Sequence, residues 1–148
     1  MDVNTIKQIR EETGAGVMDI KKAIEEAKGD SIKAKEILKQ KGIEKAEKKV
    51  DREIKSGRVF SYVHNNGSVC GCVLLGCETD FVAKNSEFEE LGGELAKQIA
   101  AMAPESIEEL LEQSYIRNNS LKIKDLVKEK IAKLGENISI GEIHRISV

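Results

Sequence analysis

Two strand-like segments joined by a tight-turn signal constrain the fold of this chain more than any other feature of its sequence. RVFSYVH (58–64) and SVCGCVLLGC (68–77) are rich in Val, Cys and aromatic residues, and Asn66-Gly67 lies between them. An Asn-Gly pair at this place is a strong hairpin signal, because both residues tolerate the positive φ angles of a tight turn. Both faces of the second segment are apolar, and the chain's own helices can cover only one of them. The sequence therefore predicts an antiparallel sheet with one apolar face left for a partner.

The first forty residues predict three short helices. TGAG (13–16) separates the first from the second, Gly29 ends the second, and Asp30 or Ser31 caps the third. Three helices of this length enclose only a small core, so they indicate a compact domain that precedes a larger one. We expect a three-helix domain at 1–41, a basic and partly helical linker at 42–56, and an α+β core at 57–148.

Serine residues mark the expected starts of three helices in the core, at Ser86, Ser106 and Ser120. The first two are followed three positions later by Glu89 and Glu109, which completes a capping-box pattern. The first of these helices carries an apolar stripe on one face, made of Phe88, Leu91, Leu95, Ile99 and Met102. The third carries apolar residues between 123 and 134 and ends at Gly135.

The C-terminal segment ENISIGEIHRISV (136–148) is typical of a strand. Ile138 and Ile140 lie on one face of the expected strand. A bulge at Gly141 would shift the alternation of inward and outward side chains, so that Ile143 continues the same face. This strand and the hairpin predict a small three-stranded antiparallel sheet packed on helices, which is the α+β class.

Charge and hydropathy exclude several classes of protein. The chain has 24 Lys and Arg against 26 Asp and Glu, so no excess of positive charge attracts nucleic acid or an anionic membrane. The N-terminal segment lacks the apolar core of a signal peptide, and no run approaches the roughly 20 apolar residues of a membrane span. We therefore expect a cytoplasmic protein with a protein or small-molecule partner, and no direct contact with nucleic acid or membrane.

The cysteine and histidine residues do not form a recognisable reactive or metal site. Strand alternation places Cys70 and Cys72 on one face and Cys77 on the other, and the usual C-x2-C spacing of a zinc site is missing. His64 lies at the expected hairpin end and His144 on a strand, neither with a nucleophile nearby. We expect reduced thiols, no metal, no cofactor, no catalytic residue and no bond-making activity.

Three segments resemble the elongation factor Ts family, the guanine-nucleotide exchange factors for elongation factor Tu. They are TGAGVMDIKKAIEEAKGD (13–30), CETDFVAKNSEF (77–88) and KLGENISI (133–140), and the likeness runs in order over nearly the whole chain. The resemblance implies that residues 1–41 form a ubiquitin-associated-type three-helix domain and that the rest is one copy of the family's core subdomain. It also implies that this chain lacks the second core subdomain and the coiled-coil insertion of the long form.

The same resemblance implies a set of partner-binding residues, namely Val17, Met18, Thr79, Asp80, Phe81, Val82 and Lys84. Asp80 and Phe81 would insert near the Mg²⁺ and phosphate sites of elongation factor Tu and promote release of GDP. Val17 and Met18 would dock on a helix of its G domain.

Residue patterns alone leave two of these placements open. An aromatic residue beside a strand end, such as Phe81, is ordinarily buried. Met18 either lies in a loop and folds into the small core, or lies on the helix opposite the stripe of Ile20, Ala23 and Ile24.

The expected partners are elongation factor Tu, in its GDP-bound and nucleotide-free forms, and a second copy of this chain. A homodimer would cover the second apolar face of the sheet, and short-form members of the family are similar to half of the long form doubled by a two-fold axis. The alternative function is a binding module that docks through the three-helix domain without promoting exchange.

Overall fold

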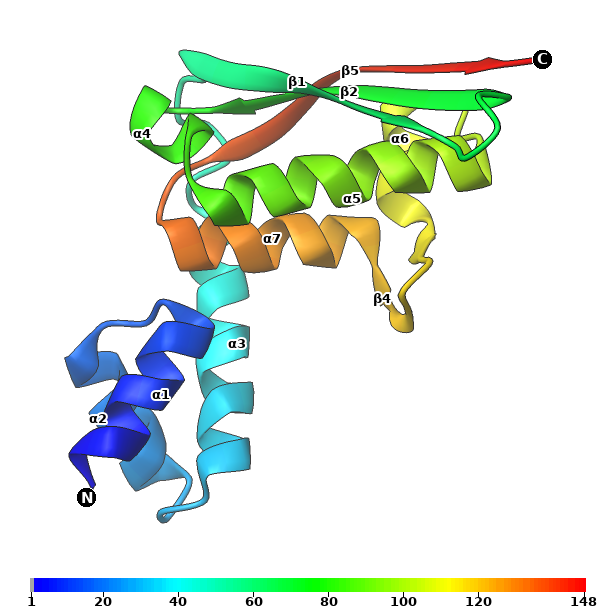
Figure 1. The fold of residues 1–148 in the computed structure, drawn as a ribbon. Helices are drawn as coiled ribbons and strands as arrows, with labels where there is room; N and C mark the ends of the chain where they lie inside the picture. The colour runs from blue at the N-terminus through cyan, green and yellow to red at the C-terminus, as the bar shows by residue number, and fades with distance from the viewer. Residues whose placement is uncertain (1) are drawn as a thin grey trace.

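A three-stranded sheet, two long helices beneath it and an N-terminal group of three helices make up the fold (Figure 1). The computed structural model describes residues 2–148. The N-terminal helices are α1 (Val3–Thr13), α2 (Val17–Glu26) and α3 (Ser31–Glu47). The sheet lies at the top of Figure 1, α5 (Ser86–Met102) lies under it, and α7 (Ile123–Leu134) lies under α5. The predicted α+β class and three-stranded antiparallel sheet are confirmed.

The start of α3 and the end of α1 lie at residues that the sequence indicates. Gly14 adopts a φ of +69°, which ends α1, and its backbone N–H donates to the Arg10 carbonyl at 2.8 Å. Asp30, rather than Ser31, caps α3, because its carboxylate accepts the backbone N–H groups of Ile32 and Lys33. These helices bury a cluster of their own, formed by Ile9, Ile20, Ala23, Ile24, Ala27, Ala34 and Leu38.

Helix α3 crosses the expected boundary between the three-helix domain and the linker. It continues to Glu47 and packs against α7, where Gly42 faces Ala132 so closely that a Cβ at Gly42 would lie 2.9 Å from the Ala132 Cβ. A second buried cluster starts at Ala46 and includes the sheet, α5 and α7. The two separate clusters support our proposal that the chain divides into domains at 1–41 and 57–148, joined by residues 42–56.

The sheet has the order β1-β2-β5, with β1 (Ser56–Val63), β2 (Val69–Cys77) and β5 (Ile138–Ser147) all antiparallel to their neighbours. The predicted hairpin turn is confirmed: Gly67 has a φ of +72° and its N–H donates to the His64 carbonyl at 2.7 Å. The predicted bulge is also confirmed. Leu74 pairs with Glu142 and Leu75 with Ile140, which leaves Gly141 as the extra residue.

One face of the sheet packs on α5 through residues that approach the helix backbone closely. A Cβ at Gly71 would lie 2.3 Å from the Ala96 carbonyl oxygen, and a Cβ at Gly92 would lie 2.1 Å from the Phe60 ring. Four of the five residues of the predicted apolar stripe are buried there, namely Phe88, Leu91, Leu95 and Ile99. Met102 is the exception: it is 50% exposed, because α5 extends beyond the buried cluster at its last turn.

Two of the predicted helix starts are wrong. Asn85, not Ser86, caps α5, since the Asn85 side chain reaches the Glu87 N–H at 2.8 Å. Ser120 does not open a helix, because its hydroxyl donates to the Asn118 side chain at 2.6 Å and Ser120 lies in a strand. That strand, β4 (Asn118–Lys122), pairs with β3 (Ser114–Tyr115) in a small hairpin that the sequence did not predict, and α7 follows it.

The other helix signals of the core are confirmed. Ser106 caps α6 (Ile107–Glu112) by accepting the Glu109 N–H at 3.0 Å, although the Glu109 carboxylate accepts the N–H of Glu105 rather than that of Ser106. Gly135 ends α7 with a φ of +76°. Within residues 2–148, no helix combines the length and the apolar character that crossing a bilayer requires.

Candidate functional site

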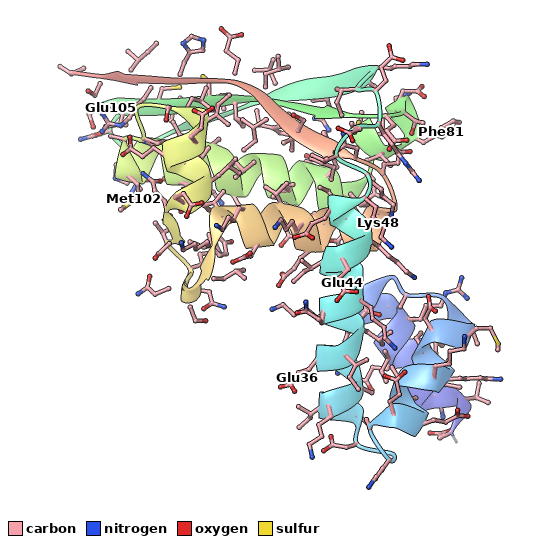
Figure 2. The ribbon with its side chains drawn as sticks, turned by 180° about the vertical axis from the view of Figure 1, so that it is seen from behind. Glu36, Glu44, Lys48, Phe81, Met102 and Glu105 are labelled. Carbon is pink, nitrogen blue, oxygen red and sulfur yellow. The ribbon has the colours of Figure 1, made fainter. Side chains whose placement is uncertain are left out.

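A single helical turn between the sheet and α5 carries the central residues of the candidate site. This turn, α4 (Asp80–Ala83), is attached to the core through Val82 and Ala83, both of which are buried. Phe81 points the other way and is 83% exposed, and Figure 2 shows it at the outer edge of the fold beside α4. A large apolar ring exposed on a firmly packed corner is unusual, because burial would remove its surface from water. Phe81 is therefore a candidate contact residue rather than part of the core.

The predicted site residues around Phe81 divide into exposed and structural ones. Asp80 and Lys84 are exposed and form an ion pair of 3.8 Å with each other, a type of surface pair that is easily exchanged for other partners. Val82 is buried and packs into the core, whereas Phe81 points outward, and the binding role of Val82 stays a prediction. Thr79 is half-buried and caps α4, accepting the Val82 N–H at 3.4 Å.

The loop between α7 and β5 holds the start of α4, a role that the sequence analysis missed. The Glu136 carboxylate accepts hydrogen bonds from the backbone N–H of Glu78 at 3.2 Å, from that of Thr79 at 3.0 Å and from the Thr79 hydroxyl at 2.7 Å. The sequence analysis treated this segment as the entrance to a strand and as part of the family resemblance, but gave Glu136 no role. The KLGENISI motif was the available signal, because its polar residues lie between two apolar elements.

Val17 and Met18 form a second candidate contact in the first turn of α2. Met18 is 65% exposed and Val17 is partly exposed, whereas Ile20 and Ala23 are buried on the opposite face of the helix. Of the two placements that the residue pattern left open, the structure shows the one with Met18 on the helix and outside the apolar stripe, and the role of Met18 in binding stays a prediction. A hydrogen bond from Lys45, at 2.8 Å, fixes the neighbouring Asp19 and holds the pKa of that carboxyl below its usual range.

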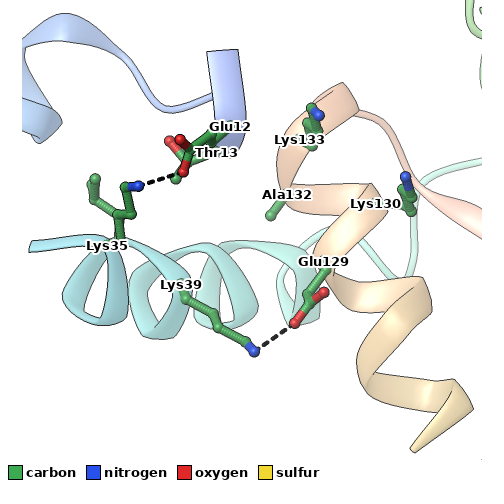
Figure 3. Close-up of a pocket in the computed structure, with 9 residues that line it drawn as sticks. Glu12, Thr13, Lys35, Lys39, Glu129, Lys130, Ala132 and Lys133 are labelled. Atoms are coloured by element: carbon green, nitrogen blue, oxygen red, sulfur yellow. Dashed lines mark ion pairs between the residues drawn. The ribbon is translucent and has the colours of Figure 1, made fainter. Parts of the chain in front are cut away.

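Both candidate contacts lie on the same side of the molecule. Figure 1 shows α4 at the upper left and the α1–α2 pair at the lower left, with α3 and the end of α7 to their right. A hollow of about 360 Å³ lies between α1, α3 and α7 (Figure 3). Its walls carry ion pairs, Lys35 with Glu12 at 2.6 Å and Lys39 with Glu129 at 2.7 Å. These paired charges join elements of the fold across the hollow.

Comparison with known proteins decides the family. The family model described as elongation factor TS matches residues 78–148, which contain α4 and the Glu136 loop. The chain is 40% identical to elongation factor Ts of Coprothermobacter proteolyticus, over 98% of this chain and 96% of that protein. It is 41% identical to elongation factor Ts of Thermotoga neapolitana, over 100% of this chain and 97% of that protein. The chain belongs to the elongation factor Ts family.

Members of the elongation factor Ts family are translation elongation factors, and their lengths differ. The alignments with the two relatives named above span 190 and 191 positions, so these proteins carry residues within the aligned region that this shorter chain lacks. Elongation factor Ts of Clostridium kluyveri is 45% identical over 97% of this chain, but the match covers only 47% of that protein. This chain therefore spans about half the length of that relative.

The outer face of the sheet carries several exposed apolar residues in this elongation factor Ts homologue. No helix of residues 2–148 covers it in Figure 1, and Val59, Val63, Leu74 and Ile146 are exposed there. Cross-strand pairing places Val59 beside Leu74, and it places Cys70 between Val63 and Ile146. The expectation of an uncovered apolar face is confirmed.

The cysteine and histidine residues lie as the strand alternation predicts. Cys70 and Cys72 are half-buried on the outer face with their Sγ atoms 3.7 Å apart, whereas Cys77 is buried on the other face. Burial raises the pKa of the Cys77 thiol. His64 lies at the hairpin and contacts the Tyr62 hydroxyl at 3.1 Å, and His144 is exposed and contacts Glu142 at 2.7 Å. In the described part of the chain, no three His, Cys, Asp or Glu side chains converge as metal ligands would.

Proposed function

We propose that this chain is a guanine-nucleotide exchange factor for elongation factor Tu, and that Asp80 and Phe81 form the wedge that promotes release of GDP. The observation that carries the proposal is the exposure of Phe81 on a helical turn whose other side is anchored in the core. Such an arrangement presents an apolar ring without loss of the fold's own packing. Membership of the elongation factor Ts family supplies the partner.

The wedge acts through coupled binding equilibria. If it binds nucleotide-free elongation factor Tu more tightly than the GDP-bound form, it lowers the affinity for GDP by the same factor. Insertion near the bound Mg²⁺ is an effective way to weaken GDP binding. That ion offsets the negative charge of the phosphates and so helps to hold the nucleotide in place. No covalent bond of the protein is made or broken, so the function requires no catalytic residue and no cofactor of its own.

Met18 and Val17 supply the second contact in this proposal. An exposed Met is flexible and polarizable, which suits an apolar partner surface, and buried apolar anchors often dominate interface energetics. The position of α2 and α4 on the same side of the fold supports simultaneous contact of both with one partner.

We also propose that two copies of the chain associate through the outer face of the sheet. Ile146 is 70% exposed on this face, and exposed apolar patches of this kind are typical of interaction surfaces. Static light scattering at micromolar concentration tests the dimer: we expect about twice the 16.3 kDa of one chain, and Ile146→Lys should restore the mass of one chain. A mass near 16.3 kDa for the unaltered protein would refute the dimer.

Release of fluorescently labelled GDP from elongation factor Tu, followed by stopped flow, tests the exchange function. The unaltered chain should accelerate release strongly, Phe81→Ala should remove most of that acceleration, and Asp80→Ala should act in the same direction with an overlapping effect. The matched control is Ile32→Ala, because Ile32 is 73% exposed on α3 and outside the proposed contacts.

Two outcomes would contradict the proposal. Unchanged release with the intact chain, together with measurable binding, would favour the alternative of a module that docks through its three-helix domain without exchange activity. Equal effects of Phe81→Ala and Ile32→Ala would show that loss of any exposed apolar side chain slows GDP release. The assignment of Phe81 as the wedge would then be wrong.

A further inference from the structure

We propose that Glu136 and Asn137 are positioning residues that hold Phe81 in its exposed direction and make it ready to enter a partner. The inference rests on the proposed function, because it assigns a supporting role to residues that touch neither Phe81 nor the nucleotide. Neither residue is among the contacts that the family resemblance implies.

Glu136 binds the corner between β2 and α4 with both carboxylate oxygens. One oxygen accepts the backbone N–H groups of Glu78 and Thr79, at 3.2 and 3.0 Å, and the other accepts the Thr79 hydroxyl at 2.7 Å. The last two of these three donors belong to the residue that caps α4. Hydrogen bonds to a charged acceptor are stronger than neutral ones, so the carboxylate holds this corner firmly.

The contact is reciprocal, which makes it a clasp between two loops. The Glu78 carboxylate accepts the backbone N–H of Asn137 at 2.8 Å. Asn137 is buried, and its side-chain NH₂ donates to the carbonyl oxygens of Val50 at 3.2 Å and Arg52 at 2.9 Å. The clasp therefore joins three segments that are distant in sequence, around residues 50–52, 78–79 and 136–137.

Helix α4 needs such external support. It is four residues long, and a helix of one turn does not persist without contacts from the rest of the fold. Val82 and Ala83 anchor its second half in the core, but Phe81 is exposed and has little packing to fix its direction. The clasp restrains the first half of α4, where Phe81 lies. A wedge that is already ordered loses less conformational entropy on binding, so it binds more tightly and faster.

Amide hydrogen exchange on the free protein tests the clasp without any partner. In Glu136→Ala, the amides of Glu78 and Thr79 should exchange about tenfold to hundredfold faster, since each loses a charged acceptor. Glu136→Gln should give an intermediate rate, because its carbonyl oxygen can accept the two N–H groups while its NH₂ cannot accept the Thr79 hydroxyl. Unchanged exchange at these amides in Glu136→Ala would overturn the clasp.

Glu105→Ala is the matched control, because it removes the same charge from an exposed position. Figure 2 shows Glu105 and Phe81 at opposite ends of the sheet. This variant should leave both the amide exchange of Thr79 and the release of GDP unchanged. If Glu136→Ala does not fold, the comparison of Glu136→Gln with Glu105→Ala tests the same point.

GDP release from elongation factor Tu tests whether the clasp acts through Phe81. Glu136→Ala should slow the accelerated release about tenfold or more, and Glu136→Gln should retain part of the acceleration. In a Phe81→Ala background, Glu136→Ala should have no further effect, since the group that it positions is gone. An equal further loss in that background would show that Glu136 acts elsewhere and would overturn the inference.

The two proposals fail in different ways. If Phe81→Ala leaves GDP release unchanged, the wedge and the role of Glu136 in exchange are both wrong, whatever the amide result. If Phe81→Ala abolishes the acceleration but Glu136→Ala does not reduce it, the wedge stands and only the positioning role is refuted.

Discussion

Two adjacent glycine residues in α5 should respond to alanine substitution in opposite directions. A Cβ at Gly92 would lie 2.1–2.4 Å from three atoms of the Phe60 ring, whereas a Cβ at Gly93 would meet nothing within 4 Å. Phe60 cannot easily move away, because it is buried and its ring packs edge-on against Phe88 with the centroids 5.8 Å apart. The pair therefore provides a test with its own internal control.

The expected magnitudes follow from these contacts. Alanine is about 0.8–1 kcal/mol more favourable than glycine inside a helix, so Gly93→Ala should stabilise the protein by about that amount. Gly92→Ala gains the same propensity, but its methyl group overlaps a buried ring, and overpacking of this kind costs about 1–3 kcal/mol or more. With the cost at the upper end, Gly92→Ala should destabilise by about 2 kcal/mol. The two variants should then differ by about 3 kcal/mol, or about 6–12 °C in Tm.

Urea unfolding followed by circular dichroism, together with thermal melting, measures both changes. Replacing the Phe60 ring with the smaller Leu side chain in the Gly92→Ala background should recover part of the lost stability, because the two residues share one contact. If both glycine variants shift stability in the same direction by similar amounts, Gly92 does not pack on the Phe60 ring, and the arrangement of helix on sheet is wrong.

Three further predictions concern the site and its support. Phe81→Ala should change the free energy of unfolding by less than about 0.5 kcal/mol, whereas Phe88→Ala should cost about 3–5 kcal/mol, and an early melt for Phe81→Ala would mean that Phe81 is part of the core. Met18→Ala should weaken binding to elongation factor Tu by more than about 1 kcal/mol without loss of stability, and unchanged affinity by calorimetry would remove Met18 from the interface. Hydrogen bonds from Lys130 and Lys133 hold the pKa of Glu87 below its ordinary value, so this carboxylate stabilises the fold at neutral pH. The gain disappears as the pH falls from that ordinary value through the lowered pKa. Glu87→Gln should therefore be less stable at pH 7 but lose less stability on acidification, and parallel pH profiles for the two proteins would contradict that origin.

Local signals in the sequence predicted most of the elements correctly. The Asn66-Gly67 turn, the bulge at Gly141 and the end of α7 at Gly135 each depend on a few neighbouring residues, so the pattern alone was sufficient. The errors arose where two local signals competed. Ser120 had the chemistry of a helix cap, but its hydroxyl bonds to the Asn118 side chain and the backbone there forms a strand instead.

The candidate site depended much more on tertiary structure. The sequence by itself determined that a strand ends before this corner and that a helix begins shortly after it, because both are properties of a single segment. It did not predict the turn of α4, and it left open whether Met18 faces the small core or lies opposite the apolar stripe. Only the packing decided that Val82 is buried and Phe81 exposed. These residues are neighbours of similar hydrophobicity, and the direction of the core is set by elements distant in sequence. The clasp of Glu136 with Thr79 likewise joins residues 57 positions apart, and a hydrogen bond of that kind exists only once the chain has folded.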